Sequence, residues 1–301
     1  MEVNRHKAGF VNIVGNPNVG KSTLMNQLVG ERISIATFKA QTTRHRIMGI
    51  VNTPEMQIVF SDTPGVLKPN YKMQEMMLAF SESALADADV LLYVTDVVEN
   101  PEKNLDFLEK VRKMKIPVIL LINKIDELAG ASSISSLSSP SSPSSLSSPS
   151  SLSGPSSTSS QTMLDAIVEK WHSLLPNAEI LPISAKNKFG VDMLMKRIQE
   201  LLPESPAYFD KDQLTDKPAR FFVSEIIREK ILLYYDKEIP YSVEVLVESF
   251  KESERNIRIR AIIYVERESQ KGIIIGHQGY ALKKVGSESR KALEKFFGKS
   301  V

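Results

Sequence analysis

A glycine-rich turn between a predicted strand and a predicted helix constrains the fold of this chain more than any other feature. Residues 10–14 form a short apolar run, and residues 21–29 continue as a helix that ends at Gly30. Backbone N–H groups in such a turn can surround phosphate oxygens, and the helix start adds positive potential. We predict a phosphate-binding loop made of Gly15, Asn16, Pro17, Asn18, Val19, Gly20, Lys21 and Ser22.

Two side chains of this loop have predicted roles. Lys21 is expected to reach the β- and γ-phosphates of a bound nucleotide, and Ser22 to offer its hydroxyl to Mg²⁺. A chance glycine turn is the alternative, and the strand–loop–helix setting argues against it.

Four more strand-like runs alternate with helical stretches, at residues 57–61, 90–95, 117–122 and 180–183. Runs that are apolar on both faces predict a mostly parallel sheet with helices on both faces. Ligands of such a sheet bind at the carboxyl ends of its strands. Polar or glycine-containing segments follow several of these runs, so we expect one site at that edge.

A second polar segment follows the run at 57–61 and consists of Asp62, Thr63, Pro64 and Gly65. It places the Asp62 carboxylate next to the expected metal and Gly65 where the γ-phosphate would lie. Gly65 can therefore respond to the presence of the third phosphate.

A polar stretch between the first helix and the next strand contains Thr42 and Thr43. A loop in this place can fold over a nucleotide. We prefer Thr43 as the hydroxyl that binds Mg²⁺, so the predicted metal ligands are Ser22, Thr43 and Asp62. Thr42 is the competing candidate, and a solvated loop is the alternative for both.

Two further segments predict a base pocket. The Asp126 carboxylate can accept hydrogen bonds from guanine's N1–H and exocyclic amine, which adenine does not present in that arrangement. The stem of Lys124 can cover the base, Asn123 can tie the two loops together, and the Ala185 N–H can reach the guanine carbonyl. In isolation the first of these segments could instead be a helix N-cap. The predicted base-pocket residues are Asn123, Lys124, Asp126, Ser184, Ala185 and Lys186.

In this order the four segments resemble the G motifs of translation-factor-related GTPases. Two stretches are similar to those of the Era family of bacterial ribosome-assembly GTPases: Gln41-Thr42-Thr43-Arg44-His45-Arg46 and Asp62-Thr63-Pro64-Gly65-Val66. The resemblance implies an α/β P-loop GTPase domain followed by a smaller α+β KH-type RNA-binding domain. It also implies GTP and GDP as ligands, Mg²⁺ as cofactor, and RNA rather than DNA as partner, namely small-subunit (16S) rRNA near its 3′ end within the 30S subunit.

The position after Gly65 bears on hydrolysis. Many GTPases have a Gln here that orients the attacking water, whereas this chain has Val66. We expect slow intrinsic hydrolysis that depends on Mg²⁺, backbone donors and something supplied from outside. In relatives of the Era family, an Asn in the place of Asn18 helps to hold K⁺, so the resemblance suggests K⁺ as a second cation. The predicted catalytic residues are Lys21, Thr43, Gly65 and Asn18.

The second predicted site is a Gly-x-x-Gly turn after two alternating strands. The pattern is weak alone, but in KH domains this turn clamps the backbone of about four nucleotides. Residues 268–301 carry seven Lys and Arg against three Glu, a net +4, which either binds phosphates or forms a solvated helix face. The predicted RNA-binding residues are Gly276, His277, Gln278, Gly279, Lys271, Lys283 and Lys284.

The length of 301 residues suggests two domains. We place the first at residues 1–202, a proline-punctuated linker at 203–219, and the second at 220–301. Ten Ser-rich triplets within residues 131–161 predict an unstructured tether, with a partner-binding arm as the alternative. The family pattern continues into a further strand after the terminal helix, so the second sheet is expected to have an unpaired edge.

Composition excludes several classes of protein. The chain has no Cys, which rules out a disulfide framework, a thiolate zinc site and a cysteine nucleophile. Its net charge of +2 rules out a strongly basic nucleic-acid-coating protein of the histone kind. Without a long apolar run or a signal peptide, we expect a cytoplasmic protein, with peripheral association with the inner face of the cell membrane as a second location. The alternative function is a nucleotide-sensing regulatory or membrane-peripheral binding module with incidental GTP turnover.

Overall fold

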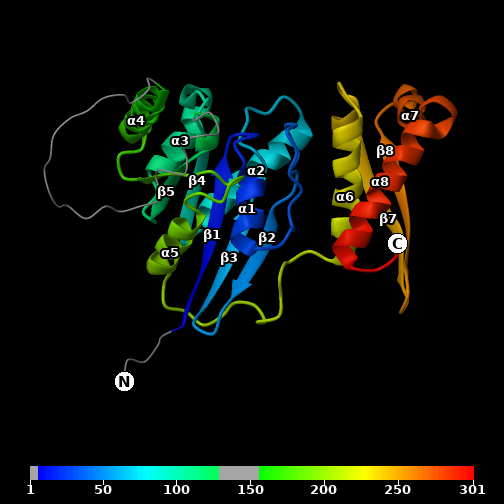
Figure 1. The fold of residues 1–301 in the computed structure, drawn as a ribbon, viewed down its shortest axis with the longest axis horizontal. Coiled ribbons are helices and arrows are strands. Elements are labelled where there is room, and N and C mark those ends of the chain that lie inside the picture. Colours follow the sequence, from blue (N-terminus) through cyan, green and yellow to red (C-terminus); the bar gives the residue numbers. More distant parts are fainter. Residues whose placement is uncertain (1–5, 129–155) are drawn as a thin grey trace, which may run out of the picture.

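The computed structural model describes residues 6–128 and 156–301 (Figure 1). The first domain contains a sheet in the order β2-β3-β1-β4-β5-β6, and β2 runs antiparallel to β3 while the other neighbours are parallel. The predicted mostly parallel sheet is therefore confirmed. Its strands are β1 (Lys7–Gly15), β2 (Ile47–Asn52), β3 (Met56–Asp62), β4 (Val90–Asp96), β5 (Val118–Asn123) and β6 (Glu179–Pro182).

Helices cover both faces of this sheet. One face carries α1 (Lys21–Val29) and α5 (Val191–Leu201), with Leu24 and Leu194 in the shared core. The other carries α2 (Lys72–Ala86), α3 (Leu105–Arg112) and α4 (Ser156–Leu174), with Phe107 and Trp171 in the core. Because both faces are covered, β4 is buried along its whole length, which explains its continuous apolar sequence.

The sequence patterns do not predict strand β2. Gly49 lies in its middle, and glycine weakens a strand pattern. In the structure this glycine lets α1 and the following loop approach the strand. A Cβ at position 49 would lie 2.4 Å from Ile33 Cδ1, 2.7 Å from Val29 Cγ2 and 2.8 Å from Met25 Cε. Close packing therefore requires glycine where the strand signal is weakest.

The predicted Ser-rich tether falls mostly on residues 131–155, which lie outside the described residues. The structure differs from the expectation at the end of the tract, because residues 156–161 form the first turns of α4. The rest of α4 packs Trp171 into the core. A helix fixed in this way extends backwards at little cost, since propagation adds one hydrogen bond per residue.

The second domain consists of a two-stranded antiparallel sheet and three helices (Figure 1). Along the first half of β7 buried and exposed residues alternate, and the buried side packs with residues of α6 and α8. The predicted helix, strand pair and terminal helix are confirmed. The elements are α6 (Ala219–Tyr234), β7 (Val243–Glu252), β8 (Ile257–Val265), α7 (Glu268–Ile275) and α8 (Tyr280–Phe297), with short helices η4 (Ile239–Tyr241) and η5 (His277–Gly279).

Strand β8 has one contact on the side away from β7. The Ile257 N–H donates to the Ser300 carbonyl over 2.9 Å, and Asn256 and Ser300 form a parallel bridge. In the part of the chain that the structure describes, strand pairing on this side is confined to that bridge. The rest of this edge is unpaired there.

The connection between α5 and α6 is held against the first domain. The Ala8 N–H donates to the Pro203 carbonyl over 3.2 Å, and the Ile50 N–H donates to the Leu214 carbonyl over 2.8 Å. The Thr215 hydroxyl donates to the Met48 carbonyl over 2.7 Å. This segment therefore leads the chain along the first sheet, from the start of β1 to β2, before the second domain begins.

Replacing Gly49 by Ala is expected to destabilise the chain, because the new methyl group must displace packed side-chain ends. Overpacking of this kind costs about 1–3 kcal/mol of unfolding free energy. Gly286→Ala in α8 is the matched control, since a Cβ there meets nothing within 4 Å. That variant should gain about 0.5–1 kcal/mol from helix propensity. Urea unfolding measures both changes, and an unaltered midpoint for Gly49→Ala would contradict the packing.

Candidate functional site

The phosphate loop joins β1 to α1 at the carboxyl edge of the sheet. Gly20 has a φ of 97°, and a Cβ at this position would lie 2.2 Å from the Asn123 side-chain nitrogen. Only glycine fits there without moving the base-pocket loop. The next residue, Lys21, turns its ammonium into the loop and donates to the carbonyls of Gly15 over 3.0 Å and Asn16 over 2.7 Å.

Lys21 is buried beside acidic groups. Burial lowers the pKa of Lys21 to about 8, and the charges of Asp62 and Glu99 only partly offset that effect. Loop carbonyls and carboxylates therefore replace water around the ammonium. A bound phosphate would supply negative charge at the same place and favour the protonated lysine.

Asp62 collects hydroxyl groups from several segments. Its Oδ2 accepts hydrogen bonds from Ser22 Oγ over 2.7 Å and from Ser34 Oγ over 2.5 Å. Thr43 Oγ1 lies 2.8 Å from Ser22 Oγ and 3.4 Å from Asp62 Oδ2. The carboxylate is fully buried, and this burial raises the pKa of Asp62.

The Asp62 cluster fits a hard divalent cation. Asp62 Oδ1 is buried and has no hydrogen-bond partner among the described residues. The Ser22 and Thr43 hydroxyls lie at the other oxygen, Oδ2. Together these groups are the kind of oxygen ligands that Mg²⁺ prefers, with nucleotide phosphates completing the set. In residues 6–128 and 156–301, no cluster of three or more His, Cys, Asp or Glu side chains offers a competing metal site.

The loop of residues 30–46, here called the switch loop, contains both candidate threonines and gives their hydroxyls different partners. Thr43 faces the Asp62 cluster, whereas the Thr42 hydroxyl bonds within the loop, 2.7 Å from Thr37 Oγ1 and 2.6 Å from the Lys39 carbonyl. The geometry therefore favours Thr43 as the metal ligand. The sequence reasoning missed Ser34, whose surroundings carry no motif.

The segment after β3 is pinned on both sides. The Thr63 hydroxyl donates to the Ile13 carbonyl over 2.8 Å, and the Pro64 carbonyl accepts from the Ser81 hydroxyl over 2.8 Å. Gly65 lies against the phosphate loop, since a Cβ there would be 2.7 Å from Pro17 Cα. Val66 is buried in the apolar core, so its side chain cannot orient a water molecule.

The base-pocket segments meet around Asn123. Its side-chain amide donates to the Val19 carbonyl over 2.7 Å, which joins this loop to the phosphate loop. Its Oδ1 accepts from the Ala185 N–H over 2.9 Å, so that N–H is engaged within the protein rather than left for a guanine carbonyl. Ser184 Oγ donates to Asp126 Oδ1 over 2.6 Å and holds the carboxylate in place.

Two acidic residues at and just after the end of β4, Asp96 and Glu99, were missed by the sequence reasoning. Asp96 pairs with Lys124 over 2.7 Å. Glu99 accepts from Thr95 over 2.6 Å and from Asn16, and burial raises the pKa of Glu99 to about 7. A signal was present, because β4 ends at the same edge as the strands that carry the motifs.

The Gly-x-x-Gly turn lies between α7 and α8. Gly276 and Gly279 have φ values of 71° and 74°, and a Cβ at Gly276 would lie 2.6 Å from Ala281 Cβ. Tyr280 follows the turn with 74% of its surface exposed, which provides an aromatic face that the sequence reasoning overlooked. Lys284 lies on the Tyr234 ring, 4.5 Å from its centre.

The other predicted RNA-binding residues lie around this turn. His277 and Gln278 form the turn itself within η5, and Lys271 is exposed on α7, where it pairs with Glu268 over 3.2 Å. Lys283 is exposed on α8. The turn therefore brings backbone, aromatic and basic groups to one surface.

A cavity of about 330 Å³ lies over the phosphate loop. The switch loop forms one wall from Ala36 to Thr43, and Gly65, Lys124 and Glu127 form the other. The predicted residues Pro17, Asn18, Gly20, Lys21 and Ser22 line its base. A second, larger cavity of about 800 Å³ lies between the domains and holds none of the motif residues.

Comparison with known proteins identifies the family. The model of the 50S ribosome-binding GTPase family matches residues 10–124, and the KH domain model matches residues 238–301. GTPase Era of Lactobacillus helveticus is 39% identical over 302 residues, with 100% of this chain and 90% of the relative covered. The chain belongs to the Era family of GTPases. GTPase Era of Carboxydothermus hydrogenoformans is 41% identical over 300 residues, covering 98% and 90% of the two chains.

Solved Era structures share this fold over nearly all of the chain. A crystal structure of Era with MgGDPNP and nucleotides 1506–1542 of 16S ribosomal RNA has a TM-score of 0.82 and 36% identity, over 98% of this chain and 91% of that one. Aquifex aeolicus Era bound to GDP·AlF4⁻ has a TM-score of 0.82 and 35% identity, with the same coverage. The predicted P-loop GTPase domain followed by a KH domain is therefore confirmed.

The lowered pKa of Lys21 predicts proton uptake on nucleotide binding. Above pH 8 the free protein loses the Lys21 proton, and a bound triphosphate must restore it, so GTP affinity should fall about fivefold between pH 8 and 9. Calorimetry at about pH 9 in buffers of different ionisation enthalpy measures the uptake. Lys21→Arg stays charged and serves as the control, and equal uptake by both proteins would contradict the assignment.

Proposed function

We propose that this chain is a GTP-binding and GTP-hydrolysing molecular switch that binds small-subunit rRNA near its 3′ end through its KH domain and acts in assembly of the 30S subunit. The observation that carries the proposal is the cluster of Ser22, Thr43 and Asp62 beside the buried ammonium of Lys21. The Era structure with an Mg-nucleotide and 16S rRNA supports rRNA as the second ligand.

The two proposed activities belong to successive domains of the chain. We assign residues 1–202 to the GTPase domain, 203–219 to the linker and 220–301 to the KH domain. No helix among the described residues has both the length and the apolar character to cross a membrane. A cytoplasmic location agrees with this assignment, and peripheral association with the inner face of the membrane stays a prediction.

Magnesium would be held by Ser22, Thr43 and Asp62, whose Oδ1 has no hydrogen-bond partner among the described residues. When bound, Mg²⁺ neutralises the charge of the β- and γ-phosphate oxygens. Lys21 contributes a second positive charge from inside the loop, and the backbone N–H groups of residues 15–22 bind and orient the phosphates. Positioning and charge stabilisation are the main contributions that phosphoryl transfer asks of a protein.

Gly65 is the proposed sensor of the third phosphate. Its contact with Pro17 places the segment after β3 directly beside the phosphate loop. Because Val66 cannot orient the attacking water, intrinsic hydrolysis is slow and leaves room for acceleration from outside. That behaviour suits a switch whose lifetime in the GTP state is set by a partner.

Guanine selection is assigned to Asp126. Its Oδ1 accepts a hydrogen bond from the Ser184 hydroxyl. The carboxylate has further lone pairs that can accept from the N–H groups of the base. Lys124 covers one side of the base pocket, and its pairing with Asp96 fixes its stem. Adenine does not present these two donors, so the carboxylate would lose its hydrogen bonds to the base. That loss is the physical origin of the preference.

Hydrolysis is expected to require K⁺ through Asn18. Asn18 is exposed in the nucleotide cavity, whereas Asn16 turns inward to Glu99. Wild type should turn over at least about tenfold faster in K⁺ than in Na⁺, and Asn18→Ala should show equal rates in the two salts. Asn16→Ala is the matched control and should keep the K⁺ preference. Equal wild-type rates in K⁺ and Na⁺ would remove Asn18 from the mechanism.

Single-stranded RNA with the 3′-terminal 16S sequence is expected to accelerate GTP hydrolysis. Gly279→Asp should weaken that effect about tenfold or more, because a carboxylate would face RNA phosphates. Gly298→Asp is the matched control: it has a similar φ of 65° and equally open space, but lies at the far end of α8. Stimulated turnover against RNA concentration provides the measurement, and an equal loss in both variants would argue against the turn.

The alternative of a binding module with incidental turnover makes a different prediction for the same assay. Such a module would bind GTP and RNA without any coupling between RNA and hydrolysis. Full-length similarity to GTPases and the convergence of Ser22 and Thr43 on Asp62 both favour the switch.

A further inference from the structure

The second domain grips the part of the switch loop that surrounds Thr43. Lys39 donates to Asp236 Oδ1 over 3.0 Å and to the Tyr235 carbonyl, just after α6. The His45 ring packs against Phe221 of α6, with ring centres 5.8 Å apart. Residues on both sides of Thr43 are therefore held by elements of the KH domain.

Arg44 reaches from the switch loop into the second domain. Its side chain is only 4% exposed. The guanidinium donates to the carbonyls of Val243 over 2.7 Å, Tyr241 over 3.0 Å and Pro240 over 3.3 Å. Three backbone carbonyls of η4 and β7 thus solvate a charge that burial would otherwise penalise.

Arg228 makes the opposite connection, from α6 into the switch loop. Its guanidinium is 2% exposed and pairs in two places with Glu225, over 2.8 Å and 2.5 Å. The same group donates to the Thr42 carbonyl and, over 3.5 Å, to the Gln41 carbonyl. Gln41 has a φ of 56°, a conformation that non-glycine residues adopt only when their surroundings hold them.

Thr43 therefore sits between two anchors. The carbonyl before it is bound by Arg228 and the side chain after it is bound to η4 and β7, while its own hydroxyl points to Ser22 and Asp62. Any movement of the KH domain must move the peptide groups of Thr43 or break these bonds.

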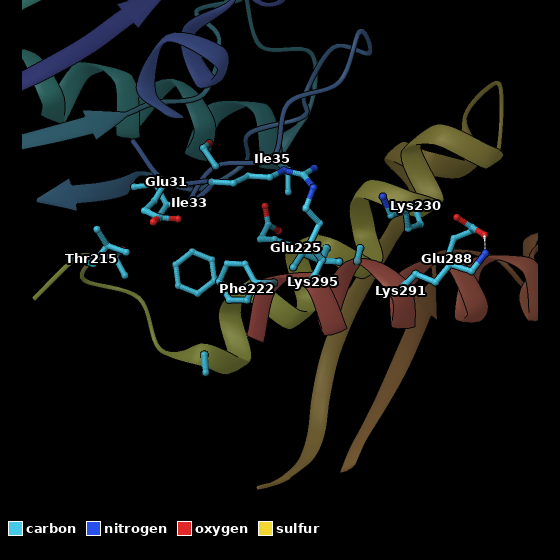
Figure 2. A pocket seen from close by; sticks show the side chains of 17 residues that line it. Glu31, Ile33, Ile35, Thr215, Phe222, Glu225, Lys230, Glu288, Lys291 and Lys295 are labelled. Atoms are coloured by element: carbon cyan, nitrogen blue, oxygen red, sulfur yellow. Dashed lines mark hydrogen bonds and ion pairs between the residues drawn. The ribbon is translucent and has the colours of Figure 1, made fainter. Parts of the chain in front are cut away.

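Other contacts also join the domains beside this one. Phe222 of α6 belongs to the same apolar cluster as Ile33 of the switch loop. A cavity of about 800 Å³, lined also by Ile35 and by Lys295 of α8, lies next to them (Figure 2). Arg32 crosses the cavity to pair with Glu229. Among these contacts, those of Arg44 and Arg228 are the ones that hold the residues next to Thr43.

We propose that Arg228 and Arg44 are positioning residues for GTP hydrolysis, which place the Thr43 hydroxyl at the metal site only while the KH domain is docked. This inference rests on the proposed function of the site. Neither guanidinium touches the nucleotide cavity, so both act through Thr43. By linkage, whatever favours Thr43 at the metal favours docking by the same factor.

Two variants test the proposal from opposite sides. Arg228→Met combined with Glu225→Gln removes the contact to Thr42 without leaving an unpaired carboxylate. Arg44→Met removes the contacts from the switch loop to the carbonyls of η4 and β7, and it needs no change in α6. For both we expect single-turnover hydrolysis about tenfold slower and a Mg²⁺ half-saturation about tenfold higher, with GDP affinity unchanged, because GDP does not require Thr43. Arg228→Lys, which keeps one donor, should restore part of the rate.

Arg46→Met is the matched control. Arg46 lies two residues from Arg44, but its guanidinium bonds within the first domain, to Ser61 over 2.6 Å and to Asp87 over 2.7 Å. It should keep the wild-type Mg²⁺ dependence.

The outcomes separate this proposal from the proposed function. Wild-type Mg²⁺ dependence in both test variants would overturn the positioning role, and so would a parallel loss of GDP affinity, which would indicate general damage to the nucleotide site. Absence of GTP hydrolysis by the unmodified protein would instead reject the proposed function. Should the α6 variant fail to fold, Arg44→Met against Arg46→Met decides the question alone.

Discussion

A buried carboxylate at the end of β3 organises the nucleotide side of this chain. Burying Asp62 is costly, and hydroxyls of Ser22 and Ser34 offset the cost at one oxygen while the other stays without a partner among the described residues. A cation at that free oxygen would satisfy the carboxylate completely. Ser22 at the start of α1 and Thr43 of the switch loop both contact this carboxylate. Cation binding at Asp62 would therefore change the surroundings of both segments.

The same carboxylate links the two domains. Thr43 approaches Asp62 from the switch loop, and the flanking residues are bound to the KH domain through guanidinium–carbonyl contacts. Backbone carbonyls make these contacts insensitive to side-chain identity at Thr42, Pro240 or Tyr241. The geometry of the chain path, rather than a surface patch, is what couples the GTPase domain to the RNA-binding domain.

The motifs were predictable because each consists of short-range chemistry. A turn that must cradle phosphate needs Gly20 and Lys21 in fixed order, and a strand end that must hold a metal needs Asp62. Strand β2, Ser34 and Arg228 were not predictable. Gly49 hides β2 because its role is close packing with α1, and Arg228 acts on a residue 186 positions away. Contacts over such distances leave no periodicity or spacing in the sequence.

The arrangement also limits where catalytic charge can come from. Val66 is buried, so the usual water-orienting side chain is missing at its position. The guanidinium groups of Arg44 and Arg228, the arginines nearest to Thr43, already donate to carbonyls and carboxylates, and moving either toward the phosphates would break those contacts between the domains. An arginine finger from these residues would therefore destroy the geometry it was meant to serve. In the proposed function, positive charge at the transition state would come from Lys21, from the proposed cations at Asp62 and Asn18, or from a partner, which accounts for the slow intrinsic hydrolysis that we expect.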